Sequence, residues 1–198
     1  MTNIGTYINF LTKLQKGQIP LNLGRYDIIS GGMSVTEERK KLVDFADPFM
    51  TVGQTVLLNA KHEDRVQSYK DLNDPEFTVV SKPGTTGEEA VQCLIPKATY
   101  ETANTEVEGA TRVLEGTADA FVYDYPFNAV FMALNPSNQL VFLSEPFTDE
   151  PIAWAIRKND PDFMKFLNDF LSRMKADGRF DQIYQEWFLN SDWHRFVR

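Results

Sequence analysis

The sequence contains very few of the residues that stabilise a fold by disulfides or bind metals. Its 198 residues include one cysteine and two histidines. Because a disulfide needs two cysteines, none can form within the chain. Cys93 lies among apolar residues in a helical pattern, and we expect it to be a buried small hydrophobic residue. With one cysteine and the distant His62 and His194, no metal-ligand spacing exists, so neither a metal nor a cofactor is expected.

Long apolar runs and excess positive charge are also missing. No stretch approaches the roughly 18 consecutive apolar residues of a membrane-spanning helix. The first ten residues, MTNIGTYINF, lack the basic region, apolar run and cleavage site of a secretory signal. The net charge of -8 disfavours binding to nucleic acids, because an acidic surface repels phosphates. Hydrophobic residues make up 42% of the chain and include 15 phenylalanines, which is enough for a core without cross-links.

Short apolar runs alternate with capped helix starts, a pattern typical of α/β proteins. Buried or partly buried strands are predicted at residues 26–29, 51–58, 77–80, 120–123, 140–143 and 152–156. Helix starts are predicted from capping boxes, in which a hydroxyl residue precedes a glutamate by three positions. These boxes are Ser34 with Glu37, Thr85 with Glu88 or Thr86 with Glu89, and Thr105 with Glu108. A further helix should follow the strand at 120–123 and end near Leu134.

The C-terminal region carries the clearest helical periodicity. Asp160 and Pro161 supply a cap and a first-turn proline, and Gly178 ends the helix. Apolar residues then recur at helical spacing along two segments. The first stripe is Phe163, Phe166, Leu167, Phe170, Leu171 and Met174; the second is Phe180, Ile183, Tyr184, Trp187 and Phe188. We expect both stripes to belong to the core.

Two strand–turn–helix elements indicate where a ligand could bind. One passes from Ile29 through Gly31 and Gly32 to Ser34, and the other from Val80 through Gly84 to Thr85. Ligands of α/β sheets collect beyond the carboxyl ends of strands, where helix N-termini present free amides to a negative group. From spacing alone, the simpler interpretation is that these hydroxyls only cap their helices, and it is the one favoured at this point.

Four separated segments resemble the type II periplasmic solute-binding proteins, in particular the polar amino-acid receptors of ABC importers, family 3. Residues 26–58, YDIISGGMSVTEERKKLVDFADPFMTVGQTVLL, are similar to the core signature of that family. The second-lobe loop is matched by residues 79–90 (VVSKPGTTGEEA) and a later strand-to-helix turn by 121–128 (FVYDYPFN). The tail from residue 157 to 188 resembles the C-terminal helices of the family. The resemblance covers nearly everything from about Gly24 onward, in order.

The resemblance implies an α/β fold of two three-layer α/β/α lobes joined by two hinge strands, with the ligand in the cleft between the lobes. Lobe 1 would comprise residues 1–57 and 147–198, and lobe 2 residues 58–146. The hinge crossings would lie near residues 55–58 and 142–146. At the front, the chain resembles the family only from a helix at residues 6–16. Lobe 1 is therefore expected to lack the family's opening strand, and Tyr7 is a weak candidate for an aromatic ligand contact.

The resemblance also assigns roles to six residues. Arg39 would bind the α-carboxylate of an amino acid, since its planar fork matches a carboxylate and keeps its charge. Ser34 and the backbone around Gly32 would add hydrogen bonds to the same group, and Thr85 and Thr86 would reach it from lobe 2. Asp124 would accept the α-ammonium. The alternatives are that Arg39 is one charge on a solvated helix face and that Asp124 caps the following helix.

The function implied is reversible binding of a free amino acid and its delivery to an ABC transporter permease, in a periplasmic or extracellular location, without catalysis. One alternative is an enzyme of the same fold, a cyclohexadienyl (arogenate or prephenate) dehydratase. That branch has a glutamate three positions after the strand-end aspartate, where this chain has Phe127, and an asparagine in the second-lobe loop. The other alternative is a ligand-sensing module.

Overall fold

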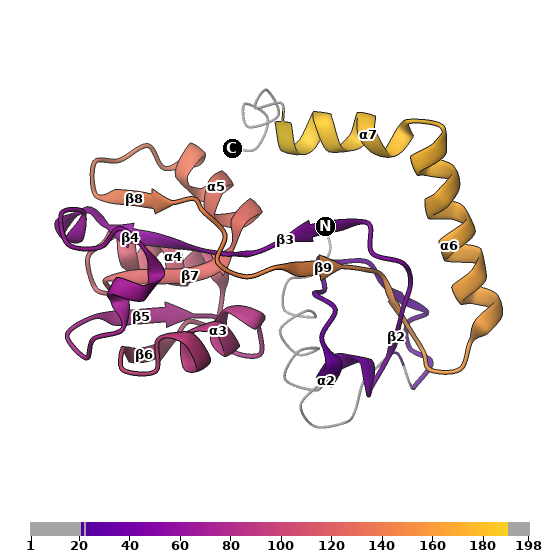
Figure 1. The fold of residues 1–198 in the computed structure, drawn as a ribbon, viewed down its shortest axis with the longest axis horizontal. Helices are drawn as coiled ribbons and strands as arrows, with labels where there is room; N and C mark the ends of the chain where they lie inside the picture. Colours follow the sequence, from indigo (N-terminus) through magenta and orange to yellow (C-terminus); the bar gives the residue numbers. More distant parts are fainter. Residues whose placement is uncertain (1–20, 22, 190–198) are drawn as a thin grey trace. The chain divides into compact units, whose positions relative to one another are not determined.

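The chain folds into two compact units, one of which is built from both ends of the sequence. In the computed structural model, which describes Leu21 and residues 23–189, unit 1 comprises residues 1–51 and 150–198, and unit 2 comprises residues 52–149 (Figure 1). The chain therefore passes between units at Thr51/Val52 and at Asp149/Glu150. The segments expected at the crossings, 55–58 and 142–146, both lie inside unit 2. Tyr7 and the predicted helix at residues 6–16 lie outside the described residues.

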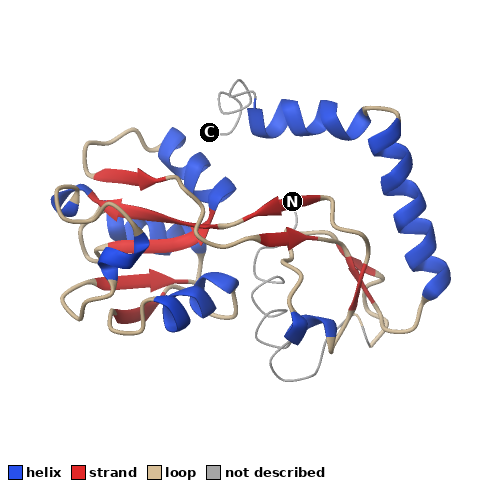
Figure 2. Ribbon diagram, viewed as in Figure 1, coloured by secondary structure: helices blue, strands red, loops and turns tan. Residues whose placement is uncertain are grey.

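Unit 2 is a five-stranded mixed sheet with helices on both faces (Figure 2). The strand order is β6-β5-β7-β4-β8, with β5 parallel to β6 and β7, and β4 antiparallel to β7 and β8. The strands are β4 (Gln54–Asn59), β5 (Thr78–Ser81), β6 (Thr99–Thr102), β7 (Ala120–Asp124) and β8 (Leu140–Leu143). The helices are η1 (Ala60–His62), η2 (Tyr69–Leu72), α3 (Thr86–Leu94), α4 (Glu106–Leu114) and α5 (Tyr125–Leu134).

Alternate residues of the central strands supply two separate hydrophobic clusters, one on each face of the sheet. On one face, Val56 and Val122 pack with Val91 and Ile95 at the end of α3. On the other, Leu57 and Phe121 pack with residues of α4 and α5. Every residue of β4 is buried, because β7 and β8 pair with its two edges and the two clusters cover its two faces. The short apolar runs in the sequence therefore correspond to strands covered on both faces.

Unit 1 contains two small sheets and the C-terminal helices. Its first sheet has the order β1-β10-β2, and the second pairs β3 with β9, next to the points where the chain passes between units. The strands are β1 (Ile28–Ile29), β2 (Asp44–Phe45), β3 (Met50–Val52), β9 (Glu150–Ile152) and β10 (Ala155–Ile156). The helices are α2 (Glu37–Lys40), α6 (Pro161–Ala176), α7 (Arg179–Tyr184) and η3 (Gln185–Leu189). In Figure 1, α7 leaves α6 in a new direction at Gly178, whose positive φ of 79° suits glycine.

Helix starts agree with the sequence wherever the cap partner is local. Thr85 caps α3, Thr105 caps α4 and Asp160 caps α6, each accepting a hydrogen bond from a backbone amide three residues later. The prediction for Ser34 is wrong, because the cap of α2 is Thr36, which accepts from the backbone amide of Arg39. The predicted strand at 51–58 is divided into β3 and β4 at Gly53, and the one at 152–156 into parts of β9 and β10.

Two expectations about burial are also wrong. Cys93 is exposed, because it lies on the outer face of α3, whereas Val91 and Ile95 point to the core. The second apolar stripe is not core either: Ile183, Tyr184 and Trp187 are 46%, 37% and 49% exposed. The first stripe is only partly core, since Leu167 and Leu171 are buried while Phe166 is 58% exposed. Periodicity identifies an apolar face, but another element must cover that face before it is buried.

Candidate functional site

In unit 1, Ser34 is buried at a bridge to β9, far along the chain. Its hydroxyl donates a 2.7 Å hydrogen bond to Oε2 of Glu150, 116 residues away. Its backbone forms an isolated bridge with Ile152, and the amide of Val35 donates to the carbonyl of Pro151 at 2.8 Å. These contacts explain why Ser34 does not cap α2. The hydroxyl instead holds a carboxylate that is 8% exposed.

Glu150 is a residue that the sequence analysis missed. It lies at the start of β9 and is one of few buried acidic residues among those described. Buried carboxylates require partners, and such groups often serve a function. The only local signal is an acidic residue at the beginning of a predicted strand, and its partner Ser34 cannot be read from sequence spacing.

The Arg39 side chain points toward the segment around Ser34. It lies in α2, is half-buried, and donates from Nη1 to the carbonyl oxygen of Ser34 at 2.9 Å. The two lysines that follow behave differently, because Lys40 and Lys41 form exposed ion pairs with Glu37 and Glu38 of the same helix. Arg39 is thus distinct from the solvated charges around it. The structure brings Ser34 and Arg39 together, whereas Gly32 lies two residues earlier in an exposed turn with a φ of 59°.

In unit 2, Thr85 and Thr86 begin α3 and have different partners. Thr85 Oγ1 accepts from the amide of Glu88 at 3.4 Å and donates to the carbonyl of Lys82 at 2.7 Å. Thr86 Oγ1 instead accepts a 3.1 Å hydrogen bond from Nε2 of Gln54. The bond of Thr85 to Lys82 and the bond of Thr86 to Gln54 connect the start of α3 to the preceding loop and to β4.

Asp124 is at the N-cap position of α5, but its side chain makes no capping hydrogen bond. Its Oδ1 accepts a 2.6 Å hydrogen bond from Nε2 of Gln54, which is fully buried at the start of β4. The capping interpretation of Asp124 is therefore wrong. Gln54 connects Asp124 to Thr86, and it too was missed, because in the sequence it looks like one polar residue beside an apolar strand.

Partly buried polar contacts hold the loop between β5 and α3. The Lys82 ammonium is 2.7 Å from a carboxylate oxygen of Glu106, and its side chain is 3% exposed. Glu88 accepts from the amide of Gly84 at 2.7 Å and from the Tyr100 hydroxyl at 3.2 Å. Burial raises the pKa of Tyr100 to about 12, and the neighbouring Glu88 adds to the rise, so this hydroxyl stays protonated as a donor.

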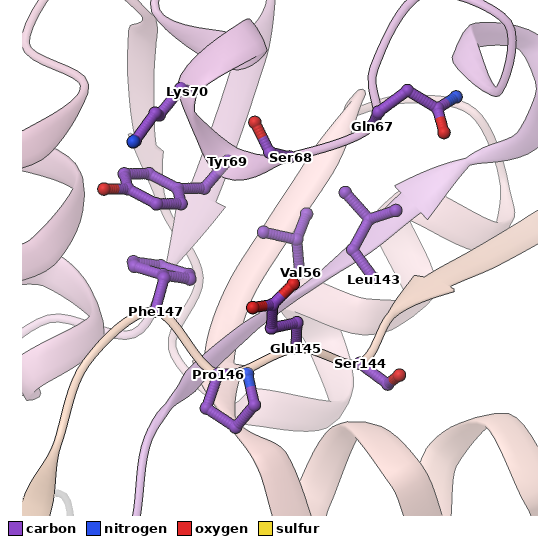
Figure 3. Close-up of a pocket in the computed structure, with 10 residues that line it drawn as sticks. All are labelled: Val56, Gln67, Ser68, Tyr69, Lys70, Leu143, Ser144, Glu145, Pro146 and Phe147. Carbon is purple, nitrogen blue, oxygen red and sulfur yellow. The ribbon is translucent and has the colours of Figure 1, made fainter.

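Unit 2 also contains a cavity of about 460 Å³ that none of the six predicted site residues lines. Figure 3 shows its apolar floor, Val56 and Leu143, between the segment 67–70 and the segment 144–147. The rings of Tyr69 and Phe147 stack at one side, with centroids 4.3 Å apart. Most of its polar lining residues are exposed. The cavity therefore lacks the buried polar groups that fix a ligand in a specific site.

The described residues form neither a metal site nor a membrane-spanning helix. No group of three or more potential metal ligands occurs within residues 23–189 or at Leu21. None of the helices described here is long and apolar enough to cross a bilayer. Phe127, at the position where the dehydratases have a glutamate, packs against Phe121, Tyr123 and Phe131. Its ring has no proton to transfer.

Comparison with known proteins identifies the family. The model of the bacterial extracellular solute-binding proteins, family 3, matches residues 4–190. The chain belongs to this family. It has the two-lobed type II periplasmic binding protein fold, as the sequence predicts.

Three relatives illustrate the similarity of this family 3 protein to others. The glutamine-binding protein of an ABC transporter from Bacillus subtilis is 34% identical over 174 residues, which cover 87% of this chain and 62% of the relative. A proposed binding component of an ABC transporter from Wolinella succinogenes, crystallised with lysine, is 43% identical with a TM-score of 0.84, over 88% of this chain and 75% of that one. An ancestral amino acid-binding protein, described as a precursor of cyclohexadienyl dehydratase, is 41% identical with a TM-score of 0.79, over 85% and 72%.

The family 3 chain is shorter than its curated relatives. It covers 62% and 57% of the length of two glutamine-binding proteins. It covers 63% of a relative described as a probable histidine-binding protein.

Proposed function

We propose that this protein binds a free polar amino acid reversibly. The proposal assigns the ligand α-carboxylate to Arg39, with Ser34, the backbone at Gly32 and the start of α3 at Thr85 and Thr86. It assigns the α-ammonium to Asp124. A ligand that carries both a carboxylate and an ammonium, as an amino acid does, fits this assignment better than a simple acid or amine.

The observation that carries the proposal is the state of Asp124. An aspartate at an N-cap position ordinarily accepts hydrogen bonds from the first-turn amides of its helix. Asp124 makes no such bond and is oriented by Gln54 instead. A carboxylate that is held in place without serving its own helix is suited to accept hydrogen bonds from a ligand ammonium.

Glu150 extends the assignment in unit 1. Its buried carboxylate contacts the Ser34 hydroxyl at 2.7 Å, and Arg39 contacts the Ser34 carbonyl at 2.9 Å. Ser34 is thus flanked by a cation and an anion. We assign Glu150 to the same site, as the acceptor that fixes the orientation of the Ser34 hydroxyl.

The relatives support a polar ligand side chain. One binds glutamine, and a chain 43% identical to this one was crystallised with lysine. Glutamine and lysine are therefore the first ligands to test. We further propose that the protein acts outside the cytoplasm, in the periplasm or extracellular space, and delivers the amino acid to an ABC transporter permease, which the family description and the relatives' names support.

A thermal-shift screen of the twenty amino acids tests the proposal, followed by calorimetry on Arg39→Ala. A ligand at one hundred times its Kd stabilises the folded protein by about 2.7 kcal/mol. Arg39→Ala should weaken binding by about 2–5 kcal/mol, the cost of removing one partner from a charged pair. Lys41→Ala is the matched control, because its exposed pair with Glu38 lies on the same helix end. Parent affinity in Arg39→Ala, or no shift with any amino acid, would contradict the proposal.

A dehydratase activity is the second candidate, favoured by the similarity to the precursor of cyclohexadienyl dehydratase. Dehydration requires a general acid to protonate the leaving hydroxyl. Phe127 cannot do this and packs into an aromatic cluster instead. We therefore propose binding without catalysis. Ultraviolet monitoring of arogenate and prephenate decides the matter, since measurable turnover would favour the enzyme.

A further inference from the structure

We propose that Gln54 is a positioning residue that sets the orientation of Asp124 and Thr86 and thereby the selectivity of the site for a ligand ammonium. This inference rests on the proposed function, since it concerns two of the residues assigned to the ligand. Gln54 lies outside the predicted loops and helix starts, at the first position of β4.

The side-chain amide of Gln54 uses both of its N–H groups within the site. Nε2 donates to Asp124 Oδ1 at 2.6 Å and to Thr86 Oγ1 at 3.1 Å. The orientation of the amide follows from chemistry, because an ionised carboxylate only accepts hydrogen bonds and must face the NH₂ end. The side chain is fully buried, so water does not compete for either bond.

These two bonds determine what Asp124 and Thr86 can present to a ligand. Since Thr86 Oγ1 accepts from Gln54, its own proton must be donated in another direction. Gln54 contacts one oxygen of Asp124, which restrains the direction in which the carboxylate points. An amide donates without carrying a charge, so Gln54 adds no positive charge beside Asp124. A lysine or arginine at position 54 would neutralise that charge and remove the attraction for an ammonium.

Neighbouring backbone holds Gln54 in this position from two directions. In the sheet register Gln54 lies opposite Asp124, so the two side chains start from paired positions of β4 and β7. The backbone amide of Gln54 donates to Thr148 Oγ1 at 2.8 Å, and the backbone carbonyl of Gln54 accepts from the backbone amide of Phe147 at 3.0 Å. The segment before the second crossing therefore anchors the main chain of the residue that orients Asp124.

Gly87 leaves the space that the Gln54 side chain occupies. A Cβ atom at residue 87 would lie 2.9 Å from Gln54 Oε1 and 2.9 Å from the carbonyl oxygen of Val122. Because the Val122 carbonyl belongs to the backbone of β7, an alanine at residue 87 would push the start of α3 away from the sheet as well as displacing the glutamine amide. An alanine at residue 87 therefore disturbs the contact between Gln54 and Thr86 without removing any polar atom of Gln54.

The experiment compares Gln54→Met, which keeps length but removes both donors, with Gly87→Ala. Calorimetry measures the affinity of each for L-lysine and L-glutamine, and for the same two molecules without the α-amine. Gln54→Met should bind the amino acids at least about 10-fold more weakly, the scale of a lost hydrogen bond to a charged group. The deaminated analogues should lose less affinity than the amino acids, because only their carboxylate contact at Thr86 is disturbed. Gly87→Ala should shift selectivity in the same direction, and Gln67→Met, at an exposed glutamine of unit 2, should not.

Gln54→Glu adds a readout that a purely structural role would not change. Two carboxyl groups at hydrogen-bond distance do not both ionise readily, so they share one proton. The preference for the amino acid over its deaminated analogue should therefore vary with pH between about 5 and 8 in Gln54→Glu, and stay constant in the parent, whose glutamine does not titrate.

The outcomes separate this inference from the proposed function. Parent-like selectivity in Gln54→Met and Gly87→Ala, while Asp124→Asn loses amino-acid binding, would overturn the role of Gln54 and leave the function standing. Equal losses for amino acids and analogues would also overturn it, since they indicate general damage. If the parent binds no amino acid, both proposals fail. Should Gln54→Met not fold, Gly87→Ala and Gln54→Glu decide the question.

Discussion

At the scale of single residues, two aspartates that look alike in the sequence have different roles. Asp124 and Asp160 each precede a helix with a proline in its first turn. Asp160 Oδ1 accepts from the amide of Phe163 at 3.2 Å and caps α6. Asp124 accepts from the side chain of Gln54 instead. The difference arises because β4 brings an amide donor to Asp124 from 70 residues away.

Asp124→Asn therefore has a specific expected effect on binding. The substitution preserves shape but removes the negative charge that would attract an ammonium. We expect amino acids to lose at least about 10-fold in affinity, because a hydrogen bond to a charged group contributes about 1.5–3 kcal/mol. Analogues without the α-amine should lose much less. Calorimetry with each pair of ligands measures the two losses.

Asp160→Asn is the matched control for this prediction. Asparagine caps helices about as well as aspartate, so this variant should keep both stability and ligand affinity. If Asp124→Asn weakened amino acids and deaminated analogues equally, the ammonium role of Asp124 would be wrong.

Gln54 and Glu150 were both missed in the sequence for the same physical reason. Each lies at the start of a strand, and each contacts its partner through the fold rather than along the chain. Sequence patterns concern neighbours within one turn of helix or two residues of strand. Capping patterns and the family resemblance together pointed to Ser34, Thr86 and Asp124, but not to the buried polar groups that contact them.

At the scale of elements, glycine determines how closely α4 approaches the sheet. A Cβ atom at Gly109 would lie 2.3 Å from Cε2 and 2.6 Å from Cδ2 of Phe121. Phe121 is fully buried in β7 and also stacks with Tyr123, so its ring has little room to move. The helix can pack on this ring only because residue 109 lacks a side chain.

Gly109→Ala should therefore destabilise unit 2 although alanine favours helices. Overpacking costs about 1–3 kcal/mol, and the gain in helix propensity offsets about 1 kcal/mol. We expect a net loss of up to about 2 kcal/mol in the free energy of urea unfolding. Val107→Ala on the same helix, at a position that is 55% exposed, should change stability by less than about 0.5 kcal/mol. A Gly109→Ala variant at least as stable as the parent would show that Phe121 can give way.

Local elements were the most predictable part of this fold. The starts of α3, α4 and α6 follow from capping residues whose partners lie three residues away. Ser34 shows where this approach fails: Ser34 and Thr36 could each cap α2, and Glu150 decides the choice by accepting the Ser34 hydroxyl. The prediction that the apolar stripe of α7 belongs to the core is wrong for a related reason, because the sequence does not say which surface would cover that stripe.

At the scale of the whole molecule, each unit has its own core and its own acid-sensitive contact. In unit 1, Asp44 of β2 accepts from Lys158 Nζ and from the amide of Asn159, both at 2.9 Å, beyond β10. In unit 2, Asp119 accepts from Lys61, from His62 and from the amide of Thr78, just before β7. Each carboxylate thus connects segments that are distant in sequence.

Both aspartates have a lowered pKa. The hydrogen bond from Lys158 is the main reason that the pKa of Asp44 lies below its ordinary value. Burial raises the pKa of Asp119, but the hydrogen bonds from Lys61, Thr78 and His62 together outweigh burial and lower it. A carboxyl group with a lowered folded-state pKa stabilises the fold above its unfolded value of 3.8, and this stabilisation disappears as pH falls through the folded-state pKa.

The protein should therefore lose stability in acid, in both units, as pH falls below about 4. Replacing either aspartate with asparagine removes the titrating group and its ionic contacts. Asp119→Asn should be less stable than the parent at pH 7, but should lose less free energy of unfolding between pH 7 and pH 3. Asp44→Asn should behave in the same way, and the double variant should have the flattest profile. Urea unfolding monitored by circular dichroism at several pH values measures these slopes. If the variants lost as much free energy of unfolding between pH 7 and pH 3 as the parent, the contacts at Asp44 and Asp119 would not be the source of the acid sensitivity. Other carboxylates would then have to account for it.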